Sequence, residues 1–204
     1  MSPRVSSLIC LLGFPALSGS PLAPPQTVDA AAVEAVAQPG DVVFRRGQGL
    51  VSRVVLSGDR DPEFSHVGIV AERDGALVVV HATPSDNGAP EPIRTEPLAD
   101  FYAPESADLG AVRRPLDPTA GRIAATAAQR LARGRAFDPD LDLDTDDRLY
   151  CTELVWKAYR DAGIDLTDGQ LDYAHGLLSH DGPLVFPSTL LHSPSLAPIP
   201  GLSL

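Results

Sequence analysis

The stretch Tyr150 to Tyr159, YCTELVWKAY, decides the fold, because it sets a cysteine at the start of a predicted helix. Its apolar residues recur at helical spacing, at Leu154, Val155, Ala158 and Tyr159. Gly163 ends this pattern. A helix is therefore predicted over Cys151 to Ala162, with the thiol at its N-terminus. Since the positive end of a helix dipole stabilises a thiolate, we expect the pKa of Cys151 to fall below its usual value of about 8.5.

Two β-branched runs lie upstream of this helix, His66 to Ala71 (HVGIVA) and Ala76 to His81 (ALVVVH). An Asp-Gly step joins them and predicts a hairpin of antiparallel strands. His66 opens the first strand and His81 closes the second, so the hairpin brings both imidazoles to one end of the sheet. This arrangement suits His66 as a general base for Cys151 and His81 as the acceptor that orients it.

Roles other than catalysis are also open to these three residues. A lone cysteine is often a small buried hydrophobe, and the two histidines could be half-buried strand residues with satisfied nitrogens. A zinc site is disfavoured because the sequence lacks tight ligand pairs such as HExxH or CxxC. The remaining histidines lie among Gly, Ser and Pro in the tail, where exposed loops are expected: His175, His180 and His192.

The rest of the chain supplies a strand at Gly40 to Phe44 (GDVVF) and a short helix at Gly49 to Ser57. Further expected elements are a loop over Pro84 to Pro97, a strand over Gly110 to Pro115, a helix over Pro118 to Gly134, and a tail of loops with one short strand. The acidic run from Asp138 to Asp147 does not match an EF-hand, since Thr145 replaces the required glycine, and it is expected to be a solvated loop or strand edge.

The N-terminus has the pattern of a secretory signal peptide over residues 1–18, with Arg4 before an apolar run too short to span a bilayer. Residues 19–38 are rich in Pro and Ala and are expected to be a linker, which leaves 39–204 as one domain. A secreted or periplasmic protein without stable membrane insertion follows from this pattern. After removal of the leader, Cys151 is the only cysteine, so it cannot form an internal disulfide.

Composition narrows the class of protein. Hydrophobic residues make up 44% and charged residues 21% of the 204 residues, as in ordinary globular proteins. The formal net charge of -11 disfavours a nucleic-acid partner, because such proteins carry clustered Lys and Arg.

The order of motifs GDVVF, SHVGIV, VVVHA, YCTELVWKAY and LVFPSTLLHS resembles the permuted branch of the NlpC/P60 superfamily, the YiiX/YebB-like cysteine hydrolases. The resemblance implies a papain-like α+β fold in which an antiparallel sheet packs against the helix that carries the cysteine at its N-terminus. It implies Cys151 as nucleophile, His66 as base and His81 at the third polar position, where relatives often carry Glu. No cofactor is implied.

The resemblance further implies hydrolysis of amide or peptide bonds, with peptidoglycan-derived peptides as the expected substrate. Two alternatives stay open. A lipid-acyl hydrolase or acyltransferase would need an exposed apolar patch near the site, and the 5% aromatic content and lack of a clear amphipathic helix count against it. A catalytically silent module would bind cell-wall peptides without turning them over.

Overall fold

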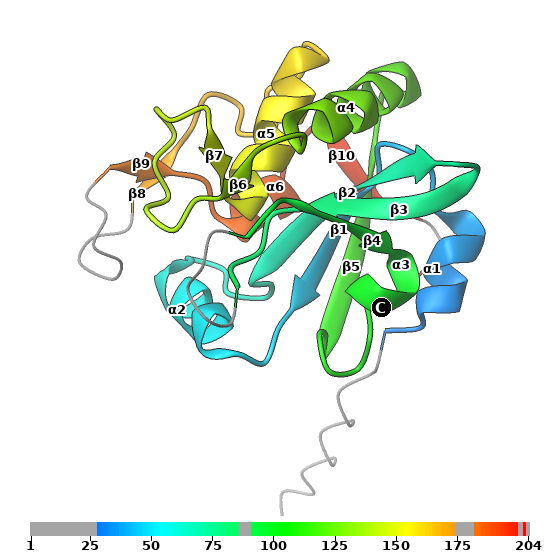
Figure 1. Cartoon of the computed structure of the whole chain (residues 1–204), viewed down its shortest axis with the longest axis horizontal. Coiled ribbons are helices and arrows are strands. Elements are labelled where there is room, and N and C mark those ends of the chain that lie inside the picture. Colours follow the sequence, from blue (N-terminus) through cyan, green and yellow to red (C-terminus); the bar gives the residue numbers. More distant parts are fainter. Residues whose placement is uncertain (1–27, 86–90, 174–181, 200–201, 203–204) are drawn as a thin grey trace, which may run out of the picture.

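A computed structural model describes residues 28–85, 91–173, 182–199 and 202. The expected signal peptide lies outside these residues. The architecture is α+β, with one six-stranded antiparallel sheet at its centre (Figure 1). Within the described ranges, no helix is long and apolar enough to cross a membrane.

The sheet has the strand order β10-β5-β1-β2-β3-β4. Its strands are β1 (Val42–Arg46), β2 (His66–Arg73), β3 (Ala76–His81), β4 (Arg94–Pro97), β5 (Leu109–Pro115) and β10 (Leu196–Pro198). Two short pairs lie apart from it: β6 (Ala136–Phe137) with β7 (Arg148–Leu149), and β8 (Asp172–Tyr173) with β9 (Pro183–Leu184). The helices are α1 (Ala30–Val36), α2 (Leu50–Gly58), α3 (Leu98–Phe101), α4 (Pro118–Leu131), α5 (Cys151–Asp161) and α6 (Pro187–Leu191).

The hairpin of β2 and β3 forms as the Asp-Gly step predicted. Ile69 pairs with Val80 and Arg73 with Ala76. Asp74 and Gly75 both have positive φ, 55° and 80°, which is the backbone that a tight two-residue hairpin turn requires. Because side chains alternate across a strand, this register determines which residues of the two strands share a face.

The two faces of the sheet are covered by different helices. Helices α4 and α5 pack on one face, where they meet buried strand residues such as Phe44, Ile69 and Val80 (Figure 1). Helices α1 and α3 cover the other face, over Val43 and Val79. Both faces of the sheet are thus buried, which explains why the strands are nearly continuous runs of β-branched residues and do not alternate between apolar and polar residues.

Close packing of α4 on the sheet depends on one glycine. Gly40 has a φ of 102°, and a Cβ there would lie 2.5 Å from the backbone of Gly121 on α4. The carbonyl of Gly40 also accepts a hydrogen bond from the Tyr159 hydroxyl on α5. The turn before β1 therefore joins both helices to the sheet.

Three segments differ from the sequence-based expectation. Residues 94–97, expected in a loop, form the edge strand β4, since Thr95 and Glu96 pair with Val80 and Val79. Residues 30–36, expected in the linker, form α1, whose Val33 is fully buried against the sheet. The tail contains more structure than one strand, because β10 extends the main sheet beside β5.

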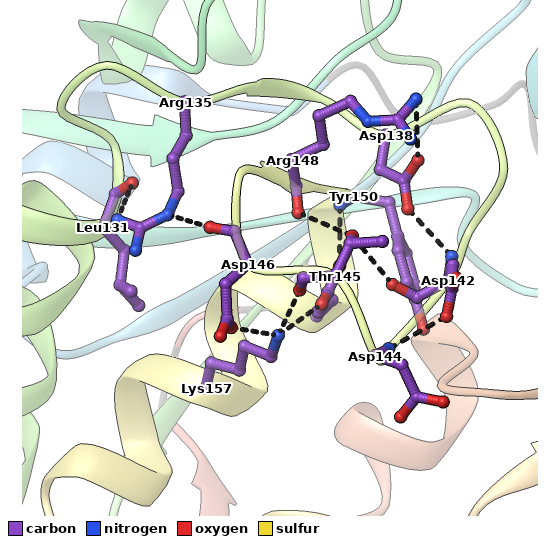
Figure 2. A network of polar contacts seen from close by, with 11 residues as sticks. Leu131, Arg135, Asp138, Asp142, Asp144, Thr145, Asp146, Arg148, Tyr150 and Lys157 are labelled. Atoms are coloured by element: carbon purple, nitrogen blue, oxygen red, sulfur yellow. Dashed lines mark hydrogen bonds and ion pairs between the residues drawn. The ribbon is translucent and has the colours of Figure 1, made fainter.

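The acidic segment between β6 and β7 is a loop, and Figure 2 shows how its carboxylates are used. Asp138 is fully buried, and its carboxylate accepts the backbone N–H groups of Asp140 and Asp142 at 3.1 and 2.8 Å. Lys157 Nζ donates to the Thr145 carbonyl at 2.9 Å. Helix α5 and this loop are therefore joined by polar contacts.

Candidate active site

Cys151 is the first residue of α5 and is partly buried. The helix start is closed by Glu153, whose carboxylate accepts the Tyr150 backbone N–H at 3.2 Å, as in half of a capping box. The sequence therefore predicted the position of the thiol on its helix correctly.

The residues on either side of the cysteine are tied to the segment before α6. The Tyr150 hydroxyl accepts the Val185 N–H at 3.0 Å, and Thr152 Oγ1 donates to the Val185 carbonyl at 2.6 Å. Tyr150 and Thr152 are almost fully buried. These contacts hold the backbone on both sides of Cys151 in place.

The hairpin brings His66 and His81 together, with His66 Nε2 at 2.7 Å from His81 Nδ1. The two rings meet edge to face, their centroids 5.0 Å apart. Gly68 makes room for this contact, because a Cβ there would lie 2.4 Å from Val79 Cγ1 and 3.1 Å from His81 Cβ. His81 is fully buried, and His66 is 9% exposed and lines the same cavity as Cys151.

Glu96 completes this row of polar groups, and sequence reasoning missed it. Its Oε1 lies 3.0 Å from His81 Nε2, off the direction of a well-aligned hydrogen bond, and 3.8 Å from Arg45 Nη1. It comes from β4, in the Pro-rich stretch that was expected to be a loop. RTEP has no alternation of apolar and polar residues and the strand covers just four residues, so the sequence carried no local signal for it.

The proton positions in the row follow from its last member. Contacts with His81 and Arg45 hold the pKa of Glu96 below its usual value against the opposing effect of burial, so this carboxylate is ionised and only accepts hydrogen bonds. Burial lowers the pKa of His81 and, much further, that of His66, so both imidazoles are neutral. His81 then carries its proton on Nε2 and accepts at Nδ1 from His66 Nε2. The His66 atom left with a free lone pair is Nδ1.

The thiol differs from the expectation. Burial raises the pKa of Cys151 to about 11, although backbone hydrogen bonds from Val67 and Thr152 and the charge of Arg45 act in the opposite direction. The helix N-terminus stabilises the thiolate less than the loss of its hydration destabilises it. Cys151 and His66 therefore rest as a neutral thiol and a neutral imidazole, and the pKa lowering predicted from the helix start alone is wrong.

Arg45 places a positive charge beside this row, with Nη1 3.8 Å from Glu96 Oε1. Its guanidinium lies over the Phe101 ring, 4.5 Å from the centroid, and Nη1 donates to the Phe101 carbonyl at 2.7 Å. The charge lowers the pKa of both His66 and His81. Arg45 therefore disfavours a resting imidazolium, in agreement with a neutral pair of thiol and base.

Substituting Glu96 tests this proton arrangement. Glu96→Gln is expected to lower kcat about 10- to 100-fold with little change in KM, because an amide can also donate to His81 Nε2 and so reverse both tautomers. Nitrogen-15 NMR of the imidazoles measures the tautomer directly. Glu91→Gln, which removes the partner of Arg94 in the same segment, is the matched control. An unchanged kcat with His66 still protonated at Nε2 would contradict the role of Glu96.

The buried carboxyl of Glu153 should make the stability of the protein depend on pH. It is fully buried beside Lys157, with 2.9 Å between Oε1 and Nζ, and burial raises its pKa from 4.5 to about 7. Between these two values the folded state binds more protons than the unfolded state, so this carboxyl makes the protein less stable as pH rises through the window.

Glu153→Gln should remove that pH dependence while keeping an acceptor for the Tyr150 N–H. Urea unfolding at pH 5 and pH 8 measures it. Relative to the parent, the free energy of unfolding of the variant should be about 1–3 kcal/mol higher at pH 8 than at pH 5. Glu72→Gln, at an exposed carboxylate of β2, should leave the difference between the two pH values as in the parent. A difference in the free energy of unfolding between variant and parent that is the same at pH 5 and pH 8 would contradict the prediction.

Of the other histidines, His192 is exposed and pairs with Asp61 at 2.8 Å, while His175 and His180 lie outside the described residues. Among the residues that the structure does describe, no three or more of His, Cys, Asp and Glu are grouped so that they could hold a metal ion. In the candidate site itself, His66 Nε2 and His81 Nδ1 are occupied by each other.

Comparison with known proteins gives a family for this arrangement. Residues 36–199 match the model of a family described as permuted papain-like amidase enzymes, YaeF/YiiX, C92 family. The uncharacterized protein YiiX of Escherichia coli K12 is 28% identical over 131 residues, 61% of this chain. The match covers 58% of that relative's length.

A solved structure shares the fold. The crystal structure described as metalloprotein yiiX from Escherichia coli O157:H7 superimposes with a TM-score of 0.64 at 22% identity, covering 79% of this chain and 96% of that one. The residues described for the present chain do not fit a metal centre, because the two imidazole nitrogens that face each other are 2.7 Å apart.

Proposed function

Because this chain belongs to the permuted papain-like amidases of the YaeF/YiiX, C92 family, we propose that it hydrolyses amide bonds through a thioester on Cys151, with His66 as general base. The observation that supports this most strongly is the row His66, His81 and Glu96. It leaves His66 Nδ1 unprotonated in the cavity that Cys151 also lines.

Acylation begins from the neutral pair. As the sulfur attacks the substrate carbonyl, the thiol proton moves to His66 Nδ1, and the S–C bond forms. The backbone N–H groups at the start of α5, beginning with that of Cys151, are the natural donors for the oxyanion. When the intermediate collapses, the C–N bond breaks and His66 returns the proton to the leaving amine.

Deacylation uses the same groups in reverse order. His66 Nδ1 takes a proton from water as the water oxygen attacks the thioester carbonyl. The C–S bond then breaks, the acid leaves, and the proton returns to the sulfur. His81 and Glu96 stabilise the imidazolium that forms transiently in both steps, since the row runs from that imidazole to a carboxylate.

The test combines turnover with trapping of the intermediate. Purified protein is incubated with muropeptides and with simple N-acyl amides, and released amine is measured together with the mass of the intact protein. Amine release with an acyl adduct that maps to Cys151 is the expected result. Binding of muropeptides without amine release and without an adduct would favour the catalytically silent binding module.

Export and a substrate from the cell wall are further parts of the proposal. They rest on the N-terminal signal pattern and on the resemblance to NlpC/P60 enzymes. N-terminal sequencing of the protein from fractionated cells would test export, with a start after residue 18 as the expected result.

A further inference from the structure

Arg45 carries a partly buried charge to which the proposed chemistry gives no direct task. Its side chain is 13% exposed, and β1 places it opposite His66 on β2 in the sheet. Removing a guanidinium from water is costly unless its charge is compensated. A charge retained beside a row of titratable side chains is therefore a candidate for a role in setting their protonation.

Contacts with α3 and β4 fix the position of this guanidinium. Nη1 of Arg45 donates to the Phe101 carbonyl at 2.7 Å and lies 3.8 Å from Glu96 Oε1. Its Cζ lies 4.5 Å from the centre of the Phe101 ring. The centroid of the same ring is 5.3 Å from that of His81, edge to face, and 5.8 Å from that of His66. Arg45 thus adjoins Glu96 and shares the Phe101 ring with both imidazoles.

His81 lies between charges of opposite sign. Glu96 is its negative neighbour, with 3.0 Å between Nε2 and Oε1, and the neutral His66 is 2.7 Å away on β2. Burial lowers the pKa of His81, the contact with Glu96 raises it, and the charges of Arg45 on β1 and Arg94 on β4 lower it again. Burial and every charge that acts on His66 lower the pKa of that residue. His81 is therefore the imidazole that would take a second proton first.

A second proton on His81 would misplace the proton of His66. The His81 imidazolium carries a proton on both nitrogens, so its Nδ1 donates to His66 Nε2 across the 2.7 Å contact and no longer accepts from it. His66 Nε2 is then the acceptor, and the single proton of the neutral His66 lies on Nδ1. Because Nδ1 is the atom that has to take the thiol proton, the base would be blocked.

We propose that Arg45 is a positioning residue, which keeps His81 at one proton and thereby keeps His66 Nδ1 available as the base. The inference rests on the proposed amide hydrolysis and adds a fourth member to its row of polar groups. Arg45 is not one of the described residues that line the cavity shared by Cys151 and His66. It therefore acts through the imidazoles and not on the substrate.

Nitrogen-15 NMR of the imidazoles in Arg45→Met tests the inference without turnover. In the parent at pH 6, each of the two imidazoles should carry one proton, on Nε2. In the variant, the major form of His81 should be protonated on both nitrogens and His66 on Nδ1 alone. Arg45→Lys keeps the positive charge and should restore the parent pattern. Arg45→Gln lacks the charge but can still donate to the Phe101 carbonyl, and it takes the place of Arg45→Met if that variant does not fold.

Steady-state kinetics give the consequence for turnover. In Arg45→Met, kcat/KM for an N-acyl amide should fall about three- to tenfold at pH 6 and approach the parent value at pH 9, where His81 has lost its second proton. Arg46→Met is the matched control, because it removes the next arginine of β1, which pairs with Asp108 at 3.1 Å. Its pH profile should coincide with that of the parent.

The two measurements separate this inference from the proposed function. Arg45→Met with His66 still protonated on Nε2 at pH 6 would overturn the inference, and turnover that depends on Cys151 would leave the amidase proposal standing. Reversed tautomers in Arg45→Met without amide hydrolysis by the parent would support the role of Arg45 and count against the amidase proposal. An equal change of tautomer in Arg45→Lys would show that the charge is not the cause and would also overturn the inference.

Discussion

Replacing Cys151 by alanine is expected to abolish amide hydrolysis, by at least about 10⁴-fold in kcat, while the fold is kept. The sulfur supplies the bond to the substrate, and Cys151 carries the only thiol among the residues that the structure describes. Only the sulfur atom of a partly buried residue is lost, so the packing of α5 on the sheet should persist. Turnover of an N-acyl amide and thermal unfolding measure the two effects.

Cys151→Ser provides a control of nearly equal size. Its hydroxyl restores the volume of the side chain but is a much weaker acid, so activity should stay low. Loss of activity in both variants at an unchanged unfolding temperature would assign the defect to chemistry. Residual activity equal to that of the parent in Cys151→Ala would rule out the proposed function.

His66→Ala is expected to lower kcat about 10²- to 10⁴-fold, because it removes the only group placed to take the thiol proton among the described residues of the cavity. His81→Ala should cost less, since His81 acts through its 2.7 Å contact with His66 and not on the substrate. Steady-state kinetics of the two variants give the order. A larger loss of kcat for His81→Ala than for His66→Ala would contradict the assignment of His66 as the base and His81 as the residue that orients it.

The pKa directions in the site also predict how the pair of Cys151 and His66 depends on pH. His66 has a pKa well below 6.5, so it stays a base, and kcat/KM should hold at pH values under 6.5 and fall only when the imidazole becomes protonated. Cys151 has a pKa of about 11, so the rate of its alkylation by iodoacetamide should rise throughout pH 6 to 9 without a plateau.

The alkylation profile of His66→Ala is the control for this prediction. A neutral imidazole holds no ion pair with the sulfur, so the profile of the variant should keep the same shape as that of the parent. A plateau near neutral pH in the parent that disappears in His66→Ala would show a resting thiolate and imidazolium, and the neutral pair would have to be abandoned.

The sequence determined the elements on which the candidate site is built. Apolar residues at helical spacing predicted α5 with Cys151 at its start, and the Asp-Gly step predicted the hairpin that brings His66 to His81. Both are local signals, since a helix period and a tight turn depend on residues close together in the chain. The motif order likewise predicted the permuted papain-like fold, with the helix of the nucleophile after the strand of the base.

The tertiary structure alone decided what surrounds those residues. Glu96 reaches His81 only because β4 pairs with β3, and an edge strand of four residues next to a Pro-rich stretch carries too little local pattern to be predicted. The high pKa of Cys151 arises from burial, and the apolar cavity beside it is lined by residues of α2, the segment around β6 and residues 184–187. Burial is a sum over segments distant in sequence, so the periodicity of any one of them could not reveal it.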